Sequence, residues 1–168
     1  MRNWLSISAI IVALDLYTKH LIQQAFAYGE HLPVTGFFDL VRYHNTGAAF
    51  SFLADAGGWQ KWFFTVVSVI AIAVITYLIK KNPNNKLFCW GLALVLGGAV
   101  GNLYDRITLG YVVDFLYFYY QAFAWPAFNV ADSAICVGVG LLLLESFLQD
   151  KSQSANTKSA SKQSAPKN

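Results

Sequence analysis

The sequence predicts an all-α integral membrane protein with four transmembrane helices and a small β-like loop domain between the first and second helices. Hydrophobic residues make up 56% of the 168-residue chain and charged residues only 12%, with a mean hydropathy of +0.43. This composition is too apolar for an ordinary soluble domain. Two segments of 18 residues, Trp62–Ile79 and Leu87–Tyr104, carry no charge and are long enough to cross a hydrocarbon core of ~30 Å. Basic residues gather in alternate connections, as in a multi-pass protein.

Four apolar segments define the predicted helices. Their approximate bounds are 4–22, 62–79, 87–104 and 129–148. The first segment also resembles a secretory signal peptide, because Ala25-Phe26-Ala27 matches an A-x-A cleavage pattern. Asp15 and Lys19 interrupt the apolar run well before that site, so we predict a retained helix and one membrane domain over residues 1–149.

The first connection, about residues 27–58, has the pattern of a small sheet. FFDLVRY is rich in β-branched and aromatic residues, HNTG has turn chemistry, and AAFSFL resembles a returning strand. We therefore expect a sheet on the membrane surface. Asn45 and Gly47 lie in the turn, where these residue types are common for backbone reasons alone, so a functional role for Asn45 stays open at this point.

The basic residues predict the orientation. Eight of the twelve Lys and Arg residues precede the first helix, lie between the second and third helices, or follow the fourth. The positive-inside rule therefore places both termini in the cytoplasm and the first and third connections outside. Residues 150–168 are rich in Ser, Lys, Ala and Gln without an apolar pattern, and we expect them to form a disordered cytoplasmic tail.

Polar residues within the predicted helices are spaced to share helix faces. Asp15 and Lys19 are four residues apart with the acid first, which favours an ion pair of structural role. Asn102 and Arg106 have the same spacing at the end of the third helix, after a GxxxG pair that allows close helix packing. Arg106 is either an anchor at the lipid headgroups or a part of a site.

Two carboxylates, Asp114 and Asp132, lie at the outer membrane boundary, and ionisable groups at membrane depth are by default functional candidates. Asn129 and Asp132 have the spacing of a capping box, which places Asp132 in the first turn of the fourth helix. The helix dipole there favours the ionised form. If Asp114 packs beside it, one of the two is expected to hold a proton near neutral pH, as in aspartic proteases.

Other sites are not indicated by the sequence. His20, His31 and His44 show no metal-binding spacing, so we expect no metal and no other cofactor. Cys89 and Cys136 are predicted at depths that differ by roughly 15 Å, too far apart for a disulfide. Phosphate-binding and nucleic-acid motifs are absent from the sequence, so no nucleic-acid partner is expected.

Five sequence blocks, in order along the chain, carry a family resemblance. They are LDLYTK, YHNTGAAFSF, GGAVGNLYDR, VVDFLYFYY and WPAFNVADS, and they span roughly Asp15–Ser133. Together they resemble lipoprotein signal peptidase, the signal peptidase II family of bacterial membranes. Each block alone is weak, whereas five in order are highly specific.

The resemblance implies a membrane aspartic endopeptidase that removes signal peptides from diacylglyceryl-modified prolipoproteins by cleaving before the lipidated cysteine. It implies a multi-pass protein of the bacterial inner membrane with its active site near the extracytoplasmic face, in contact with membrane lipid, and inhibited by globomycin. It assigns catalysis to Asp114 and Asp132, and it gives Asn45, Asn102, Arg106 and Asn129 a role in substrate binding or site geometry. Asp15 and Lys19 match polar family positions of structural role.

Three other functional classes fit the sequence less well. A small proton-coupled transporter also buries acids, but its charges are expected near the bilayer midplane and at broken helices. A Ser-Lys peptidase needs a serine one turn from the lysine, where Lys19 has Asp15. A purely structural scaffold leaves Asp114 and Asp132 unexplained.

Overall fold

The computed structural model describes residues 2–47 and 59–163, which form four helices and four strands. The helices are α1 (Arg2–Ala25), α2 (Trp59–Lys81), α3 (Lys86–Thr108) and α4 (Val130–Gln163). Within the described ranges, all four are long and apolar enough to cross a membrane. This confirms the predicted multi-pass architecture.

Helix α3 is the centre of the bundle, since it packs against each of the other three helices. Glycines make these contacts close. A Cβ atom at Gly97 would lie 2.9 Å from the carbonyl oxygen of Ser8 on α1, and one at Gly98 would overlap the carbonyl oxygen of Ala131 on α4. The predicted GxxxG pair therefore meets α1, and the glycine beside it brings α4 against α3.

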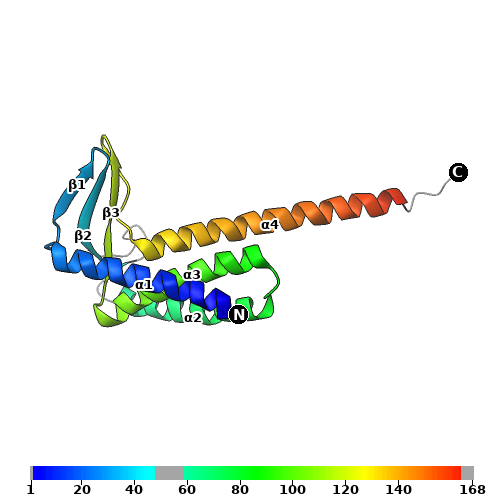
Figure 1. Cartoon of the computed structure of the whole chain (residues 1–168), viewed down its shortest axis with the longest axis horizontal. Coiled ribbons are helices and arrows are strands. Elements are labelled where there is room, and N and C mark those ends of the chain that lie inside the picture. Colours follow the sequence, from blue (N-terminus) through cyan, green and yellow to red (C-terminus); the bar gives the residue numbers. More distant parts are fainter. Residues whose placement is uncertain (1, 48–58, 164–168) are drawn as a thin grey trace.

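The sheet lies at one end of the bundle, and its strands run across the helix axes (Figure 1). The N-terminus and the connection between α2 and α3 lie at the opposite end. Helix α4 begins beside the sheet and runs back along α3 before it extends beyond the other helices. Residues at the end of α3 and the beginning of α4 are thus brought next to the sheet.

The sheet has the strand order β1-β2-β3-β4 in the described part of the chain. Its strands are β1 (His31–Thr35), β2 (Phe38–Asn45), β3 (Val112–Tyr120) and β4 (Phe123–Ala124). Strands β2 and β3 are antiparallel, and Tyr43 lies opposite Asp114.

This topology corrects the predicted placement of the sheet within the first connection alone. Besides β1, the strand that pairs with β2 comes from the third connection, where the segment VVDFLYFYY is rich in β-branched and aromatic residues. Strand β3 pairs with β2 along the edge opposite β1. The predicted returning strand AAFSFL lies outside the described residues.

Helix α4 continues to Gln163, beyond the predicted end near residue 148. Residues 150–163, which the sequence predicts to be disordered, therefore continue the helix in the structure. No Gly or Pro interrupts residues 149–163, and Pro166 is the first such residue after Gly140. An apolar pattern marks the part of a helix that packs or meets lipid, and it does not mark where the helical backbone ends.

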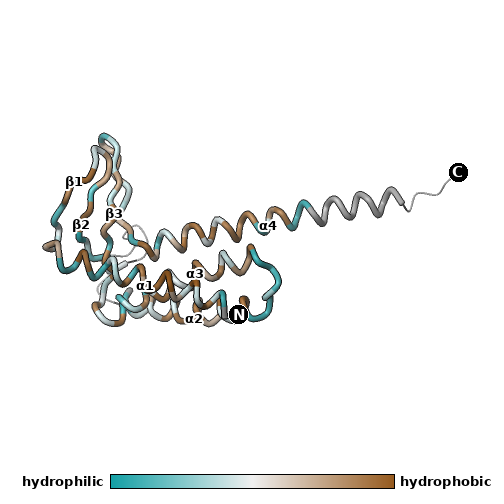
Figure 2. The backbone as a smooth tube through the Cα atoms, in the orientation of Figure 1, coloured by the Kyte–Doolittle hydropathy of each residue, from teal (hydrophilic) through white to brown (hydrophobic). Residues whose placement is uncertain are grey.

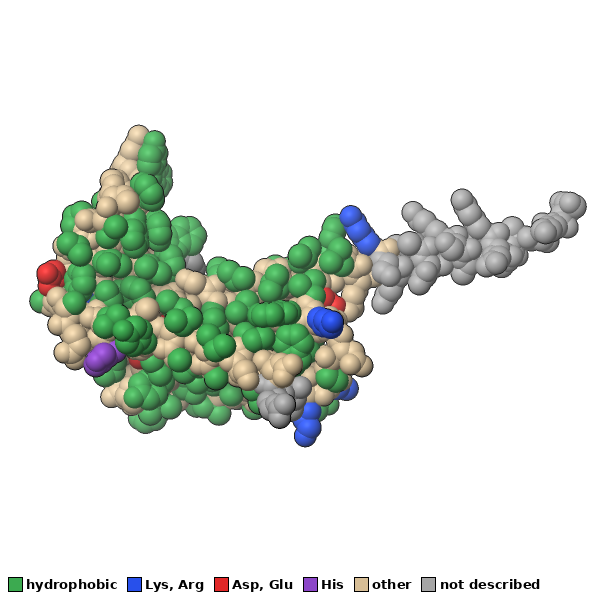
Figure 3. Space-filling view, in the orientation of Figure 1, with side chains coloured by type: hydrophobic (Ala, Val, Ile, Leu, Met, Phe, Trp, Pro, Cys, Tyr) green, Lys and Arg blue, Asp and Glu red, His purple; other side chains and the backbone are tan. Residues whose placement is uncertain are grey.

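Hydrophobic side chains cover the middle of the bundle, and the charged side chains in view lie toward its two ends (Figure 3). The same division is visible along the backbone, where the connection between α2 and α3 is hydrophilic (Figure 2). Much of α2 is exposed apolar surface, including Val66, Ile70 and Val74. Such a surface is suited to lipid rather than water.

Candidate active site

Asp114 on β3 and Asp132 in the first turn of α4 are joined by one residue, Asn129. The Asn129 side-chain Nδ2 donates to Asp114 Oδ1 at 2.7 Å, and its backbone N donates to Asp132 Oδ2 at 3.2 Å. In return, Asp132 N donates to Asn129 Oδ1 at 2.9 Å. The last two bonds form the capping box that the sequence predicts. The start of α4 therefore holds both carboxylates in one network.

Two further asparagines complete this network. Asn45 at the end of β2 donates from Nδ2 to Asp114 Oδ2 at 2.9 Å, and Asn102 on α3 donates from Nδ2 to Asp132 Oδ1 at 2.8 Å. Each carboxylate thus accepts at least two hydrogen bonds, contributed by three elements far apart in sequence. The structure brings together all three asparagines that the resemblance singles out.

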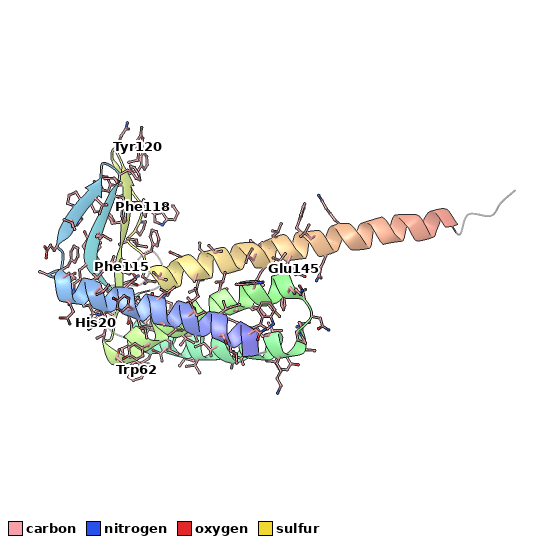
Figure 4. The ribbon with its side chains drawn as sticks, viewed as in Figure 1. His20, Trp62, Phe115, Phe118, Tyr120 and Glu145 are labelled. Atoms are coloured by element: carbon pink, nitrogen blue, oxygen red, sulfur yellow. The ribbon has the colours of Figure 1, made fainter. Side chains whose placement is uncertain are left out.

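The environment of Asp114 favours its protonated form. Its side chain is only 3% exposed, and the hydrophobic cluster of Ile22, Val113 and Phe115 lies at the same end of β3. Figure 4 places Phe115 at the foot of the sheet, beside the start of α4. Burial, together with the nearby charge of Asp132, raises the pKa of Asp114 from 3.8 to about 7. Near neutral pH Asp114 is therefore able both to give and to take a proton.

Arg106 lies one helical turn beyond Asn102 and points to the first connection. Its Nη2 donates to the backbone oxygen of Gly47 at 3.1 Å, and its guanidinium carbon lies 5.5 Å from the centre of the Phe64 ring. Its Nε is buried without a hydrogen-bond partner among the described residues. Arg106 thus connects α3 to the chain that follows Asn45.

Asp15 and Lys19 form the predicted ion pair, with 2.7 Å between Lys19 Nζ and Asp15 Oδ2. A second carboxylate, Asp105, lies 3.0 Å from the same ammonium group. Sequence reasoning missed Asp105 because it stands beside Arg106 and resembles an ordinary charge at a helix end. Its spacing of three residues from Asn102 is the signal that places both on one helix face.

Metal ligation is not indicated by the geometry. Among the described residues, no group of three or more His, Cys, Asp and Glu side chains could hold a metal ion. Cys89 is buried and Cys136 exposed, and both are free. The arrangement that remains is a pair of carboxylates at the end of a membrane bundle, one of them with a pKa near 7. Such a pair is suited to acid-base chemistry on water.

Comparison with known proteins decides the family. The family model described as Signal peptidase (SPase) II matches residues 7–148. The chain belongs to the signal peptidase II family. Lipoprotein signal peptidase of Ralstonia nicotianae is 55% identical over 142 residues, covering 84% of this chain and 82% of the relative. Lipoprotein signal peptidase of Janthinobacterium sp. is 52% identical over 145 residues, covering 86% and 88%.

Solved structures agree with this membership. A bacterial membrane enzyme solved by the in meso method at 2.3 Å resolution superposes with a TM-score of 0.81 and 29% identity, covering 91% of this chain and 92% of that one. A second, at 1.9 Å, gives a TM-score of 0.75 and 28% identity, covering 86% and 92%. As a signal peptidase II, the chain is a membrane peptidase that removes signal peptides from prolipoproteins. These relatives do not support the alternative of a proton-coupled transporter.

Proposed function

We propose that Asp114 and Asp132 are the catalytic pair of an aspartic endopeptidase that cleaves prolipoproteins immediately before a diacylglyceryl-modified cysteine. The observation that carries the proposal is the pair of bonds from Asn129, one to each carboxylate, at 2.7 and 3.2 Å. Capping of α4 requires only the two bonds between Asn129 and Asp132. The bond from Asn129 to Asp114 is additional, and it fixes Asp114 against the helix that carries Asp132.

The two carboxylates take different roles because their surroundings differ. Asp132 lies in the first turn of α4, where the helix dipole favours the ionised form, so it serves as the base. It takes a proton from water, whose oxygen attacks the scissile carbonyl carbon. Asp114, with a pKa near 7, donates a hydrogen bond to the carbonyl oxygen as negative charge develops there.

The second half of the reaction returns the protons. The tetrahedral intermediate collapses as the C–N bond breaks, and the proton held by Asp132 passes to the leaving nitrogen. Because the two groups interact, their titration belongs to the pair. Asn45, Asn102 and Asn129 hold the carboxylates in position. Arg106 binds a carbonyl of the peptide or of Gly47, and its planar fork of donors sets the geometry.

We place the site at the extracytoplasmic face of the bacterial inner membrane, with both termini in the cytoplasm, because the basic residues favour that orientation. At this boundary the two acyl chains of the substrate stay in lipid while the peptide bond meets water. Globomycin, by family resemblance, competes for the same site.

The test is a cleavage assay with purified full-length protein on a diacylated and an unmodified prolipoprotein. Asp114→Asn and Asp132→Asn keep side-chain size, but an amide neither takes up nor releases a proton near neutral pH, so each should slow cleavage at least ~10²-fold. Asp39→Asn is the matched control. Asp39 is a buried carboxylate in the same sheet, and it accepts a hydrogen bond from the Tyr119 hydroxyl at 2.9 Å. It lies opposite Tyr117 on β3, three residues along the strand from Asp114. This variant should cleave at the wild-type rate.

Substantial turnover by either variant of the pair would disprove the assignment of these residues. Equal cleavage of the diacylated and unmodified substrates would instead contradict the proposed requirement for the lipidated cysteine. Circular dichroism on each variant verifies that helical content is unchanged.

A further inference from the structure

Beside the carboxylate pair lies a buried charge cluster whose three members are Lys19, Asp15 and Asp105. The Lys19 side chain is 1% exposed, and its ammonium group lies 2.7 Å from Asp15 and 3.0 Å from Asp105. Burying one cation with two anions is costly, and apolar side chains could fill the same volume at lower cost. The cluster therefore needs an explanation other than packing.

The remaining bonds of the two carboxylates suggest one. Asp15 Oδ1 accepts from the backbone N of Ala131 at 2.8 Å, and Asp105 Oδ2 accepts from the backbone N of Val113 at 3.1 Å. Ala131 immediately precedes Asp132, and Val113 immediately precedes Asp114. Each acid of the cluster thus holds the backbone immediately before one member of the pair.

A third connection runs through Asn102. Lys19 Nζ donates to Asn102 Oδ1 at 2.9 Å. Because an ammonium group only donates, Asn102 must turn its oxygen toward Lys19 and its Nδ2 toward Asp132, to which it donates at 2.8 Å. Lys19 therefore also fixes the orientation of the amide that bonds the proposed base.

We propose that Lys19 is a positioning residue that sets the separation and orientation of Asp114 and Asp132 by holding Asp15, Asp105 and Asn102 on one ammonium group. The inference rests on the proposed function, since it concerns the geometry of that pair. Small displacements matter at such a site, where a shift of about 1 Å can cost 10²-fold in rate. Among the described residues, helix α1 donates no hydrogen bond to either carboxylate of the pair, and through Lys19 it controls the alignment of β3 with α4.

A purely structural role predicts a different result. If the cluster only holds the helices together, its loss lowers stability, and every molecule that remains folded cleaves normally. If Lys19 positions the pair, folded molecules bind substrate normally and turn it over slowly. Separate values of kcat and KM, both expressed per folded enzyme, distinguish the two roles.

The experiment compares two variants and a control on the diacylated prolipoprotein. Lys19→Met removes the ammonium group at similar volume but leaves two uncompensated carboxylates. Lys19→Met/Asp105→Asn removes one charge of each sign, so the net charge of the three side chains stays at −1 as in the wild type. The side chain at 105 keeps an oxygen that accepts from Val113. If the single variant does not fold, the double variant still tests whether Lys19 positions the pair.

Glu145→Gln is the control. Glu145 is a buried carboxylate on α4 that accepts from Asn85 Nδ2 at 2.5 Å, and it lies toward the end of the bundle away from the sheet (Figure 4). The substitution removes one buried charge of α4, which bonds the N-cap residue of α3, without reaching the pair. Turnover should stay at the wild-type value.

We expect kcat of the double variant to fall at least ~30-fold, by analogy with the rate lost to small misplacements, while KM stays within about 3-fold of wild type. Wild-type kcat in the folded double variant would overturn the role of Lys19 and leave the catalytic pair intact. Absence of cleavage by the wild type, or full activity of Asp132→Asn, would instead remove the proposed function on which the inference rests.

Discussion

Replacing Asp114 by asparagine should change how the stability of the protein depends on pH. In the folded protein, burial and the charge of Asp132 raise the pKa of Asp114 to about 7, against an ordinary value of 3.8. Below pH 3.8 the group is protonated in both the folded and the unfolded chain. As pH rises toward 7, the unfolded chain releases this proton while the folded chain keeps it. The stability that Asp114 contributes is therefore lost as pH rises through this window.

The size of the effect follows from the two pKa values. Each pH unit between them corresponds to about 1.36 kcal/mol, so the interval from 3.8 to about 7 gives about 4 kcal/mol. For a chain of this length, that free energy corresponds to roughly 8–16 °C in Tm. Asparagine has no charge to lose, so the variant should lack this part of the pH dependence. Asn45 and Asn129 both donate hydrogen bonds to residue 114. The NH2 group of an asparagine there would meet one of these donors and lose that hydrogen bond, which costs about 1–3 kcal/mol at every pH.

The assay is thermal unfolding of the purified protein in detergent, followed by circular dichroism from pH 4 to pH 8. The difference in Tm between Asp114→Asn and wild type should rise in favour of the variant from pH 4 to about pH 7 and then level off. Parallel curves for wild type and Asp114→Asn would refute the raised pKa, and with it the assignment of Asp114 as the protonated partner.

Four further outcomes are expected. Arg106→Lys should insert normally but cleave at least ~10-fold more slowly, a loss of about 1.4 kcal/mol, because lysine lacks the planar fork; wild-type kcat/KM would make Arg106 a headgroup anchor. Gly98→Ala should lower the free energy of unfolding by about 1–3 kcal/mol in thermal or denaturant assays, since its Cβ would overlap the backbone of α4, whereas Gly36→Ala, with open space around it, should not. Strong chelators should leave cleavage intact, and inactivation that added zinc reverses would contradict this. In a background without the native cysteines, a cysteine at Gln121 should react with impermeant reagents from outside and one at Asn84 should not; the opposite pattern would invert the membrane orientation.

The sequence could predict the helices because lipid imposes a simple rule. A span needs about 20 apolar residues, and composition alone marks such segments. It could also predict the bonds between Asn129 and Asp132, because a capping box is local and has a fixed spacing. Helix α4 shows the limit of this rule, since the polar residues 150–163 are outside any hydropathy pattern and still continue the helix.

Long-range pairing was harder to predict. The strand character of residues 38–45 was visible, but nothing local to that segment indicates a partner some 70 residues later. The sequence did not indicate a role for Asp105 for the same reason, because its contacts are with Lys19 and Val113, two residues from other elements. The ion pair of Asp15 with Lys19 was predictable because both lie on one helix face.

The sheet that joins β2 to β3 also sets an order of assembly. Along the chain, β1 and β2 precede α2 and α3, so the edge of β2 stays unpaired until residues 112–120 reach the same side of the membrane. An open strand edge attracts other chains, which makes this interval the vulnerable stage of biogenesis. Asp132 arrives later still, with the last helix. Until α4 is made, the nascent chain holds only Asp114 of the proposed pair, and on that assignment we expect the peptidase to stay inert until its final helix has been inserted.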